Sequence, residues 1–278
     1  MRIRIVSDLH VDVNYQYALD YPKDNTFTVV AGDVSGDPEI TSRWISENIS
    51  KGVFVAGNHI VYNHRGISLR ELKEGLAQEF PISKDVSFLD ANVGDFAKKI
   101  ENVLFLGSTL YVDGKLKSKY NPDGIVQKSG VIMENSLNDF IWGYSEYGML
   151  KAQNYFDMCM ETLIKFDEDL RKNEMTENLP VVVVTHFCPS MKFIHKYYED
   201  SWCNCAFVSD MEWFIEKHPS IKAWVCGHIH SRIFTEYVRK DSSKCLLLAN
   251  PRGYCQANED KDWTPDVFLD TDTWNLVK

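Results

Sequence analysis

RIVSDLH, residues 4–10, joins a short apolar strand to Asp8 and His10. Alternate residues of an extended strand point to the same side, so the Asp8 carboxylate and the His10 imidazole are predicted to converge just past the end of the strand. The open end of a strand is also where α/β proteins bind their ligands. An isolated Asp-x-His fits a solvated aspartate beside an ordinary histidine equally well, so the choice depends on whether the pattern recurs.

The pattern of a buried-type strand followed by ligand-type residues does recur. The strand predicted at 26–31 leads to Asp33, and the strand predicted at 52–56 leads to Asn58 and His59. The strand predicted at 180–184 leads to His186, and the strand predicted at 221–226 leads to His228 and His230. Five of the eight histidines in the chain therefore follow predicted strands, which chance placement would not produce. The set as a whole predicts a single ligand-binding centre at the strand ends.

The other segments alternate between helical and extended patterns, which is typical of an α/β protein. Helices are predicted at about 40–49, 68–80 and 149–171, and further strands at 86–89, 103–106, 244–249 and 266–270. In the longest helix, five apolar residues are assigned to the core, namely Phe156, Met160, Leu163, Ile164 and Phe166. The polar, turn-rich stretch 115–130 is predicted to be an exposed loop.

Composition limits the class of protein. The 278 residues suffice for one large domain or two small ones, and the hydrophobic fraction of 44% supports a sizeable core. A net charge of −10 argues against a long nucleic-acid track. Seven cysteines without regular spacing, no signal-like start and no apolar run of ~18–20 residues predict a cytoplasmic protein with free thiols and no membrane segment. Cys203 and Cys205 are interpreted as loop thiols, because no second pair is near enough to complete a zinc site.

The donor types limit the metal. Histidine combined with Asp or Asn, without Cys, favours Mn²⁺, Fe or Zn²⁺ over Ca²⁺ and over an all-thiolate zinc site. Seven ligands exceed what one ion needs, so two ions with a bridging aspartate are predicted. Two ions ~3.5–4 Å apart polarise phosphoryl oxygens, and a bridging water that loses its proton becomes the nucleophile of an in-line displacement at phosphorus.

The ordered set Asp-x-His, Gly-Asp, Gly-Asn-His, lone His and Gly-His-x-His, spanning residues 8–230, resembles the calcineurin-like metallophosphoesterase superfamily. Segments 108–111, 137–140, 209–213 and 250–254 are similar to a compact bacterial and phage-type branch. The resemblance implies one domain over residues 1–278 with a four-layer α/β fold, in which helices flank two mixed β-sheets. It also implies a phosphoester hydrolase.

The resemblance further implies how the ligands divide between two divalent ions. The first ion would be held by Asp8, His10, Asp33 and His230, and the second by Asp33, Asn58, His186 and His228. His59 would lie beside the scissile phosphate and stabilise the transition state or protonate the leaving oxygen. Mn²⁺ is the expected metal, with Fe, Zn²⁺ and Ni²⁺ as alternatives.

Two positions depart from the pattern common in the family. Ile60 stands where the family commonly has Asp or Glu, so no adjacent carboxylate orients His59. Phe187 stands where a second histidine often follows the lone one, which makes the wall of the site more apolar. The arginine-containing motifs of protein Ser/Thr phosphatases are absent from the corresponding blocks, which argues against that activity.

Several residues outside the main blocks remain open to two interpretations. Arg252 either binds the substrate phosphate as a bidentate donor or has a packing role. Asp139 and Asp210 are candidates for orienting the ligands, and Asp210 alternatively caps a helix. The three histidines outside the blocks, His64, His195 and His218, are interpreted as exposed or loop residues. For His195, lining of the substrate pocket is the alternative.

The favoured function is a phosphodiesterase acting on a small nucleotide-like substrate. A phosphomonoesterase or a DNA or RNA nuclease with the same metal centre is the alternative, although the acidic charge disfavours nucleic acid as a partner. A scaffold that binds metal without turnover is the alternative from another class, motivated by Ile60. Selectivity is expected to reside in the loops at 111–148 and 188–208.

Overall fold

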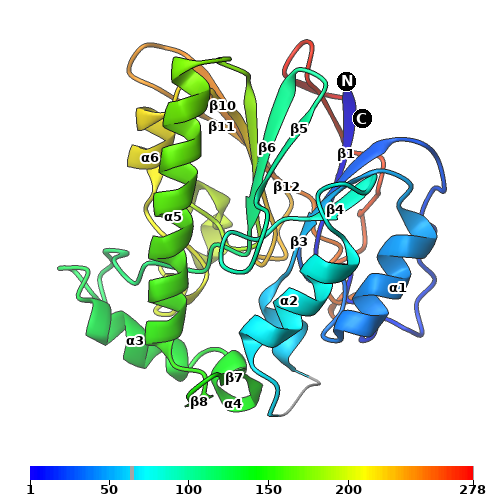
Figure 1. Cartoon of the computed structure of the whole chain (residues 1–278). Coiled ribbons are helices and arrows are strands. Elements are labelled where there is room, and N and C mark those ends of the chain that lie inside the picture. The colour runs from blue at the N-terminus through cyan, green and yellow to red at the C-terminus, as the bar shows by residue number, and fades with distance from the viewer. Residues whose placement is uncertain (63–65, 278) are drawn as a thin grey trace.

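The computed structural model describes residues 1–62 and 66–277, whose strands form two six-stranded sheets and a short hairpin (Figure 1). The first sheet contains, in spatial order, β14 (Asn275–Val277), β13 (Phe268–Asp270), β1 (Arg2–Val6), β2 (Phe27–Ala31), β3 (Gly52–Val55) and β4 (Val86–Phe88). The second contains β11 (Ile233–Val238), β12 (Lys244–Ala249), β10 (Ile221–Cys226), β9 (Val181–Thr185), β6 (Val103–Ser108) and β5 (Ala97–Ile100). The hairpin pairs β7 (Tyr144–Ser145) with β8 (Gly148–Met149).

Both sheets are mixed. Strands β1 to β4 of the first sheet run parallel, as do β6, β9, β10 and β12 of the second. The strands outside these runs are antiparallel to their neighbours: β13, β14, β5 and β11. Because parallel strands end on one side of a sheet, the polar residues that follow them are brought to a common edge.

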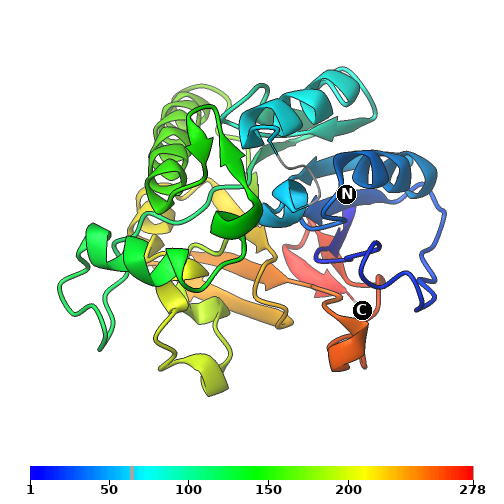
Figure 2. The same ribbon diagram turned by 90° about the horizontal axis from the view of Figure 1, so that it is seen from below.

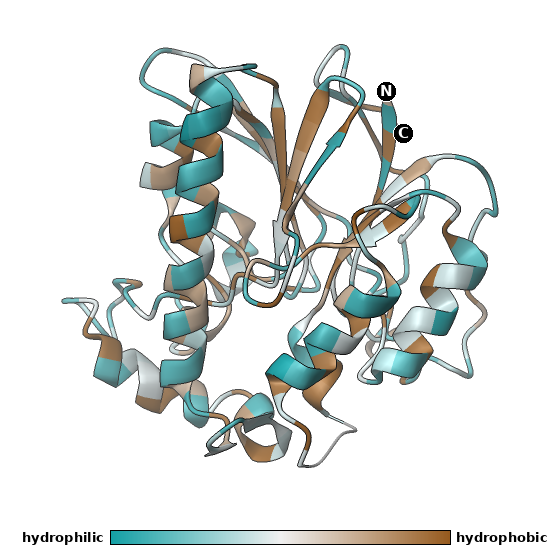
Figure 3. Cartoon of the chain, viewed as in Figure 1, coloured by the Kyte–Doolittle hydropathy of each residue, from teal (hydrophilic) through white to brown (hydrophobic). Residues whose placement is uncertain are grey.

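Most residues of the parallel strands are buried on both faces, and this double burial fixes the layers. Ile3 and Ile5 of β1 and Val182 of β9 belong to a core between the two sheets. The alternate residues Val181 and Val183 belong to a second core that includes the helices. Figure 3 shows the resulting apolar strands inside the molecule. The arrangement confirms the predicted α/β fold of two mixed sheets flanked by helices.

Six α-helices occur in the described residues: α1 (Pro38–Asn48), α2 (Leu69–Glu79), α3 (Val126–Glu134), α4 (Asp139–Trp142), α5 (Ala152–Met175) and α6 (Glu212–Lys217). Short 3₁₀ helices lie at Asn58–Val61, Met191–Phe193, Lys196–Tyr198, Asn204–Ala206 and Cys255–Ala257. In Figure 1, α1 and α2 flank the first sheet, and α5 and α6 flank the second. None of the helices in the described part of the chain combines the length and apolarity needed to cross a membrane.

The starts of the first two helices follow from local sequence. The Asp37 side chain accepts hydrogen bonds from the backbone N–H groups of Glu39 and Ile40, and Pro38 occupies the first turn of α1. Ser68 and Glu71 form a reciprocal capping box at the start of α2. These signals place both helices close to the predicted ranges.

The prediction of an exposed loop over 115–130 is wrong for its second part, because α3 begins at Val126. The polar residues that indicated a loop instead organise the approach to the helix. Buried Asn121 donates to Ile125 O and to Ser129 Oγ. Gly130 faces α5, since a Cβ there would be in van der Waals contact with the Ala152 Cβ at 3.4 Å.

The predicted core face of α5 is correct for three residues and wrong for two. Phe156, Leu163 and Phe166 are buried, whereas Met160 and Ile164 are 40% and 56% exposed. The helix buries one stripe and leaves the opposite face in solvent, so apolar character alone overestimates the core.

His218 lies in the segment directly after α6, in agreement with the loop interpretation, but it is not exposed. Its side chain is buried, with Nε2 2.9 Å from Asp167 Oδ1 and Nδ1 3.3 Å from Glu174 Oε2. Both carboxylates come from α5, which the local sequence around His218 does not reveal.

A fully buried ion pair links α2 to the segment after β4. Lys73 Nζ lies 2.8 Å from Asp90 Oδ2, and neither side chain is exposed. We expect Asp90→Asn to lower the free energy of unfolding by about 3–5 kcal/mol, because the substitution leaves a buried ammonium without its counter-charge. Urea unfolding of both proteins measures this difference.

The surface pair between Lys99 and Glu177 provides the matched control, since both of its side chains are about half exposed. Glu177→Gln is expected to change the free energy of unfolding by less than about 1 kcal/mol. Equal losses of unfolding free energy in Asp90→Asn and Glu177→Gln would show that burial does not strengthen the effect of removing an ion-pair partner.

Candidate metal centre

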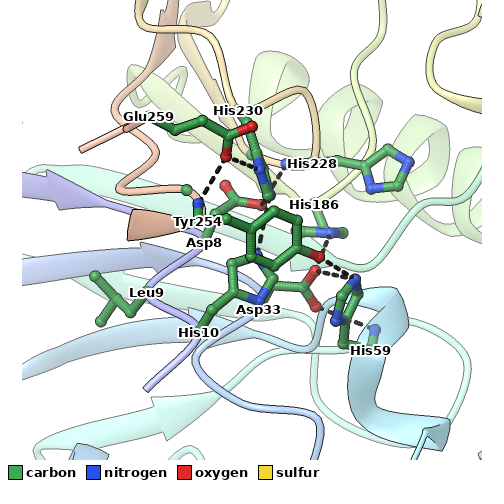
Figure 4. Close-up of polar contacts among 12 residues, drawn as sticks. Asp8, Leu9, His10, Asp33, His59, His186, His228, His230, Tyr254 and Glu259 are labelled. Atoms are coloured by element: carbon green, nitrogen blue, oxygen red, sulfur yellow. Dashed lines mark hydrogen bonds and ion pairs between the residues drawn. The ribbon is translucent and has the colours of Figure 1, made fainter. Parts of the chain in front are cut away.

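The ligand-type residues come from both sheets and meet at one end of their parallel strands. Asp8 follows β1, Asp33 follows β2, and Asn58 follows β3 of the first sheet, whereas His186 follows β9 and His228 follows β10 of the second. Figure 4 shows Asp8, Asp33, His186 and His228 together with His10, His59 and His230. The structure therefore brings residues that are up to 222 positions apart, Asp8 and His230, into one site.

One group of donors is formed by Asp8, His10 and His230. The Nε2 atoms of His10 and His230 face each other at 3.0 Å, and His230 Nε2 lies 3.5 Å from Asp8 Oδ1. Two imidazole nitrogens and a carboxylate that point at one another are suited to share a cation. Asp8 Oδ2 is buried and has no hydrogen-bond partner among the described residues, as expected for a carboxylate oxygen directed at a cation.

A second group is centred on Asp33. Its Oδ2 lies 3.2 Å from His186 Nε2 and 3.7 Å from His59 Nε2, and its Oδ1 accepts the His59 backbone N–H at 3.1 Å. Asn58 Oδ1 lies 3.0 Å from the same His186 nitrogen. Asp33 belongs to groups of metal-type donors with His10 and His59 and with Asp8 and His186, which is the arrangement required of a bridging ligand.

His228 joins the site through its backbone. Its N–H donates to Asp8 Oδ1 at 2.9 Å, while its imidazole packs against Phe187 and Phe207, with ring centroids 4.1 and 5.0 Å away. The ring centroid is 5.1 Å from that of His186, and the buried Nε2 has no hydrogen-bond partner. Phe187, the departure from the family pattern, thus forms the apolar surface against which His228 lies.

The backbone at the site has an uncommon conformation. Left-handed backbone, with φ between 44° and 68°, occurs at five of the seven predicted ligands: Asp8, His10, Asp33, His228 and His230. Such conformations cost about 1–3 kcal/mol each in non-glycine residues and cluster at functional sites. Gly57 is required for a steric reason, because a Cβ there would lie 1.8 Å from Asp33 Oδ1.

Burial and the neighbouring carboxylates shift the pKa values of the histidines in this site. Burial lowers the pKa of His10 to about 4. Burial also acts to lower the pKa of His186, but the Asp33 carboxylate outweighs it and raises the value to about 9. In the same way, hydrogen bonds to Asp8 and Glu259 overcome burial and raise the pKa of His230 to about 10. The buried carboxylates therefore attract cations, whether protons or metal ions.

Glu259 completes the site, and the sequence analysis did not identify it. Its Oε2 lies 2.7 Å from His230 Nδ1 and accepts the Tyr254 backbone N–H at 2.6 Å. This contact leaves His230 Nε2 directed toward Asp8 and His10, as second carboxylates commonly do for metal-binding imidazoles. The only local signal is that Glu259 lies five residues after the Asn-Pro-Arg-Gly-Tyr block.

Asp139 has the orienting position considered for it. It is fully buried and accepts three hydrogen bonds, from Asn58 Nδ2 at 2.8 Å, Tyr62 Oη at 2.6 Å and Tyr155 Oη at 2.9 Å. The first bond turns the Asn58 amide so that its Oδ1 faces His186. Asp139 thus orients the side-chain amide of Asn58, whereas the prediction was that it would orient the imidazole of a ligand histidine.

Two tyrosines surround His59 in place of the absent carboxylate. The Tyr62 ring lies 4.2 Å from the His59 ring, and Tyr254 Oη is 3.3 Å from His59 Nε2. Tyr254 also stacks on His10 with a centroid distance of 4.6 Å. Ile60 is buried in the core and takes no part in this environment.

Arg252 does not lie in the group that the structure brings together. Its Nη2 donates to the backbone carbonyls of Tyr17 and Ala18, and its side chain borders a separate hollow beside Trp263. These contacts tie Arg252 to residues 17–18 and favour the packing interpretation over phosphate binding.

The other residues considered above have clear positions. His195 is exposed and lines the cavity next to the donors. Asp210 is exposed and precedes α6. His64 lies outside the described residues. Cys203 and Cys205 are free thiols, and neither belongs to a metal-type donor group in the described part of the chain.

Glu259→Gln is expected to weaken divalent metal binding by about 10–100-fold, because the amide no longer provides a charged acceptor for His230 Nδ1. Calorimetric titration with Mn²⁺ measures the change. Glu236→Gln is the control, since Glu236 is exposed on β11 and pairs with Lys244 of β12. Equal affinities for all three proteins would show that Glu259 has no orienting role.

Comparisons with known proteins agree with this geometry. A model of the calcineurin-like phosphoesterase family matches residues 1–232. The crystal structure of the phosphopantetheinyl hydrolase from Mycobacterium tuberculosis is similar in fold, with a TM-score of 0.69 and 16% sequence identity over 94% of this chain and 92% of that one. A comparison with curated proteins found no match. The chain belongs to the calcineurin-like phosphoesterase family and is a metal-dependent phosphoester hydrolase.

Proposed function

We propose that this protein is a dinuclear phosphodiesterase that acts on a small phosphoester. The observation that carries the proposal is that Asp33 lies in two groups of metal-type donors, one with His10 and His59 and one with Asp8 and His186. One ion would be held by Asp8, His10, Asp33 and His230, and the other by Asp33, Asn58, His186 and His228. Mn²⁺ suits this mixture of imidazole, carboxylate and amide donors, as do Fe, Zn²⁺ and Ni²⁺.

The donors fit such ions because buried atoms on two of them lack a hydrogen-bond partner in the described part of the chain: Asp8 Oδ2 and His228 Nε2. When bound, the cations supply Lewis-acid chemistry, since they polarise phosphoryl oxygens and lower the pKa of a water molecule. The chain itself holds the ligands rigid through Glu259, Asp139 and the backbone of the strand ends.

His59 supplies the proton chemistry in this proposal. Its side chain is 14% exposed, lines the cavity and lies 3.7 Å from Asp33 Oδ2. A protonated His59 beside the phosphate would stabilise the added charge and donate its proton to the leaving oxygen. The Tyr254 hydroxyl, 3.3 Å from His59 Nε2, would hold the imidazole in position.

Room for a second ester group supports a diester over a monoester. The cavity that begins at Asp33 and His59 has a volume of about 570 Å³, which is the size of a small-molecule site rather than of a phosphate alone. The net charge of −10 makes a polyanionic nucleic acid a poor partner.

The test is a pair of initial rates with Mn²⁺ and a chelator blank. We expect bis(p-nitrophenyl) phosphate to be hydrolysed at least about tenfold faster than p-nitrophenyl phosphate, as measured by kcat/KM. Faster cleavage of the monoester would replace the proposal with a phosphomonoesterase. Metal binding without turnover of either ester would replace it with a scaffold function.

A further inference from the structure

The cavity beside the donors has a second part that phosphate does not explain. Its floor includes Asp33, His59 and His230, and its walls come from three segments that are distant in the sequence, at 136–138, 194–207 and 229–231. The 3₁₀ helix Asn204–Ala206 lies against α3, and Figure 2 shows these segments together at the lower end of the molecule. The organic groups esterified to the phosphate must therefore lie against these walls.

Part of the wall is apolar. Leu137, Ile194, Phe207 and Ile229 line the cavity. Phe207 also stacks on the His228 imidazole, so the apolar surface begins directly beside the candidate ligands. Apolar contacts of this kind favour a ligand that can bury carbon atoms.

The remaining wall is polar but carries no positive charge among the described residues that line it. Neutral hydroxyl and amide groups come from Ser136, Asn138, Ser201 and Ser231, and the carboxylates are those of Asp33 and Glu259. Sites that hold a second phosphate or a carboxylate of the ligand normally supply Arg or Lys for it. In the described lining, only histidines could carry positive charge, and three of the four, His59, His228 and His230, lie at the proposed metal centre.

We propose that the substrate carries one phosphate and that the ester group next to it is uncharged and partly apolar. This inference rests on the proposed phosphodiesterase function and specifies its substrate class. Nucleoside polyphosphates, oligonucleotides and sugar bisphosphates fall outside the class, because each brings a second anionic group to a wall whose described lining contains no Arg or Lys.

The first test compares p-nitrophenyl diesters that share a leaving group. Butyl p-nitrophenyl phosphate should have a kcat/KM about tenfold higher than methyl p-nitrophenyl phosphate, because the butyl chain contacts the apolar wall. Thymidine 5′-(p-nitrophenyl phosphate) should lose at least about tenfold when a 3′-phosphate is added. Equal values within both pairs would overturn the inference while leaving the diesterase function intact.

Two matched variants locate the effect. Ile194→Ala should reduce the butyl-to-methyl ratio, because Ile194 lines the cavity. Ile164→Ala should leave the ratio unchanged, because Ile164 is 56% exposed on α5 and does not line the cavity. Ser201→Lys should raise the relative rate with the 3′-phosphorylated thymidine compound by adding the missing cation. A ratio unaffected by Ile194→Ala would contradict the assigned wall.

A binding measurement decides the inference without turnover. Calorimetry with the Mn²⁺-loaded protein should show about tenfold tighter binding of dibutyl phosphate than of dimethyl phosphate. If no diester is hydrolysed but dibutyl phosphate binds more tightly, the proposed function fails and the inference about the wall stands. Equal binding of the two phosphates overturns the inference.

Discussion

Asp33→Asn is expected to reduce kcat/KM for a diester by at least about a thousandfold and to lower the bound metal content. Asp33 belongs to two of the groups of metal-type donors, one with His10 and His59 and one with Asp8 and His186, and it is buried. The substitution removes a negative charge between two proposed cations, where several kcal/mol of electrostatic stabilisation are concentrated, and each 1.4 kcal/mol corresponds to about tenfold in rate. Elemental analysis of the purified variant and steady-state kinetics with Mn²⁺ measure both effects.

Asp210→Asn is the matched control, because Asp210 is exposed and does not line the cavity. It should retain the metal content and the kcat/KM of the unaltered protein. Circular dichroism should show that both variants are folded. An Asp33→Asn protein with full metal content and normal kinetics would exclude Asp33 as a bridging ligand.

His59→Gln is expected to lower kcat by about 10²–10⁴-fold while the metal content stays unchanged. His59 contacts Asp33 and lines the cavity, but in this assignment it donates a proton rather than binding metal. A series of methyl aryl phosphates should therefore show a loss that grows as the pKa of the leaving phenol rises. Poor leaving groups need the proton, whereas nitrophenolate scarcely does.

Tyr254→Phe separates the positioning of His59 from its chemistry. The variant removes the hydroxyl 3.3 Å from His59 Nε2 and keeps the ring that stacks on His10. Its loss in kcat should be smaller, about tenfold. Tyr237→Phe is the control for a lost phenol, since Tyr237 pairs with Glu216 away from the cavity.

A uniform loss across all leaving groups for His59→Gln would assign His59 to phosphate binding instead of proton transfer.

Local sequence patterns were sufficient for the parallel strands of both sheets, because a strand buried on both faces appears as a short run of β-branched and apolar residues. They did not predict β5, β11 and β14, whose residues are partly exposed. They were less reliable for helices on the outside. The polar stretch 115–130 suggested a loop, yet α3 begins at Val126. Ile164 suggested a core position, yet it faces solvent, because periodicity identifies an apolar stripe without fixing its width.

The sequence by itself determined where ligand-type residues stand, since a strand of known length ends at a predictable residue. Asp8 and Asp33 follow parallel neighbours, so strand order alone brings them together. The tertiary structure decided which side chains from irregular segments reach them. Glu259, Tyr254 and Asp139 contact His230, His59 and Asn58 from loops and a short helix.

Those contacts depend on how the segments after β12 and before α5 fold over the strand ends, and irregular segments have no periodicity from which their path could be predicted. The same reason separates Arg252 from the site. A guanidinium next to a Gly-Tyr pair resembles a phosphate ligand in the sequence, but only the packed chain shows that two backbone carbonyls, of Tyr17 and Ala18, already accept its hydrogen bonds.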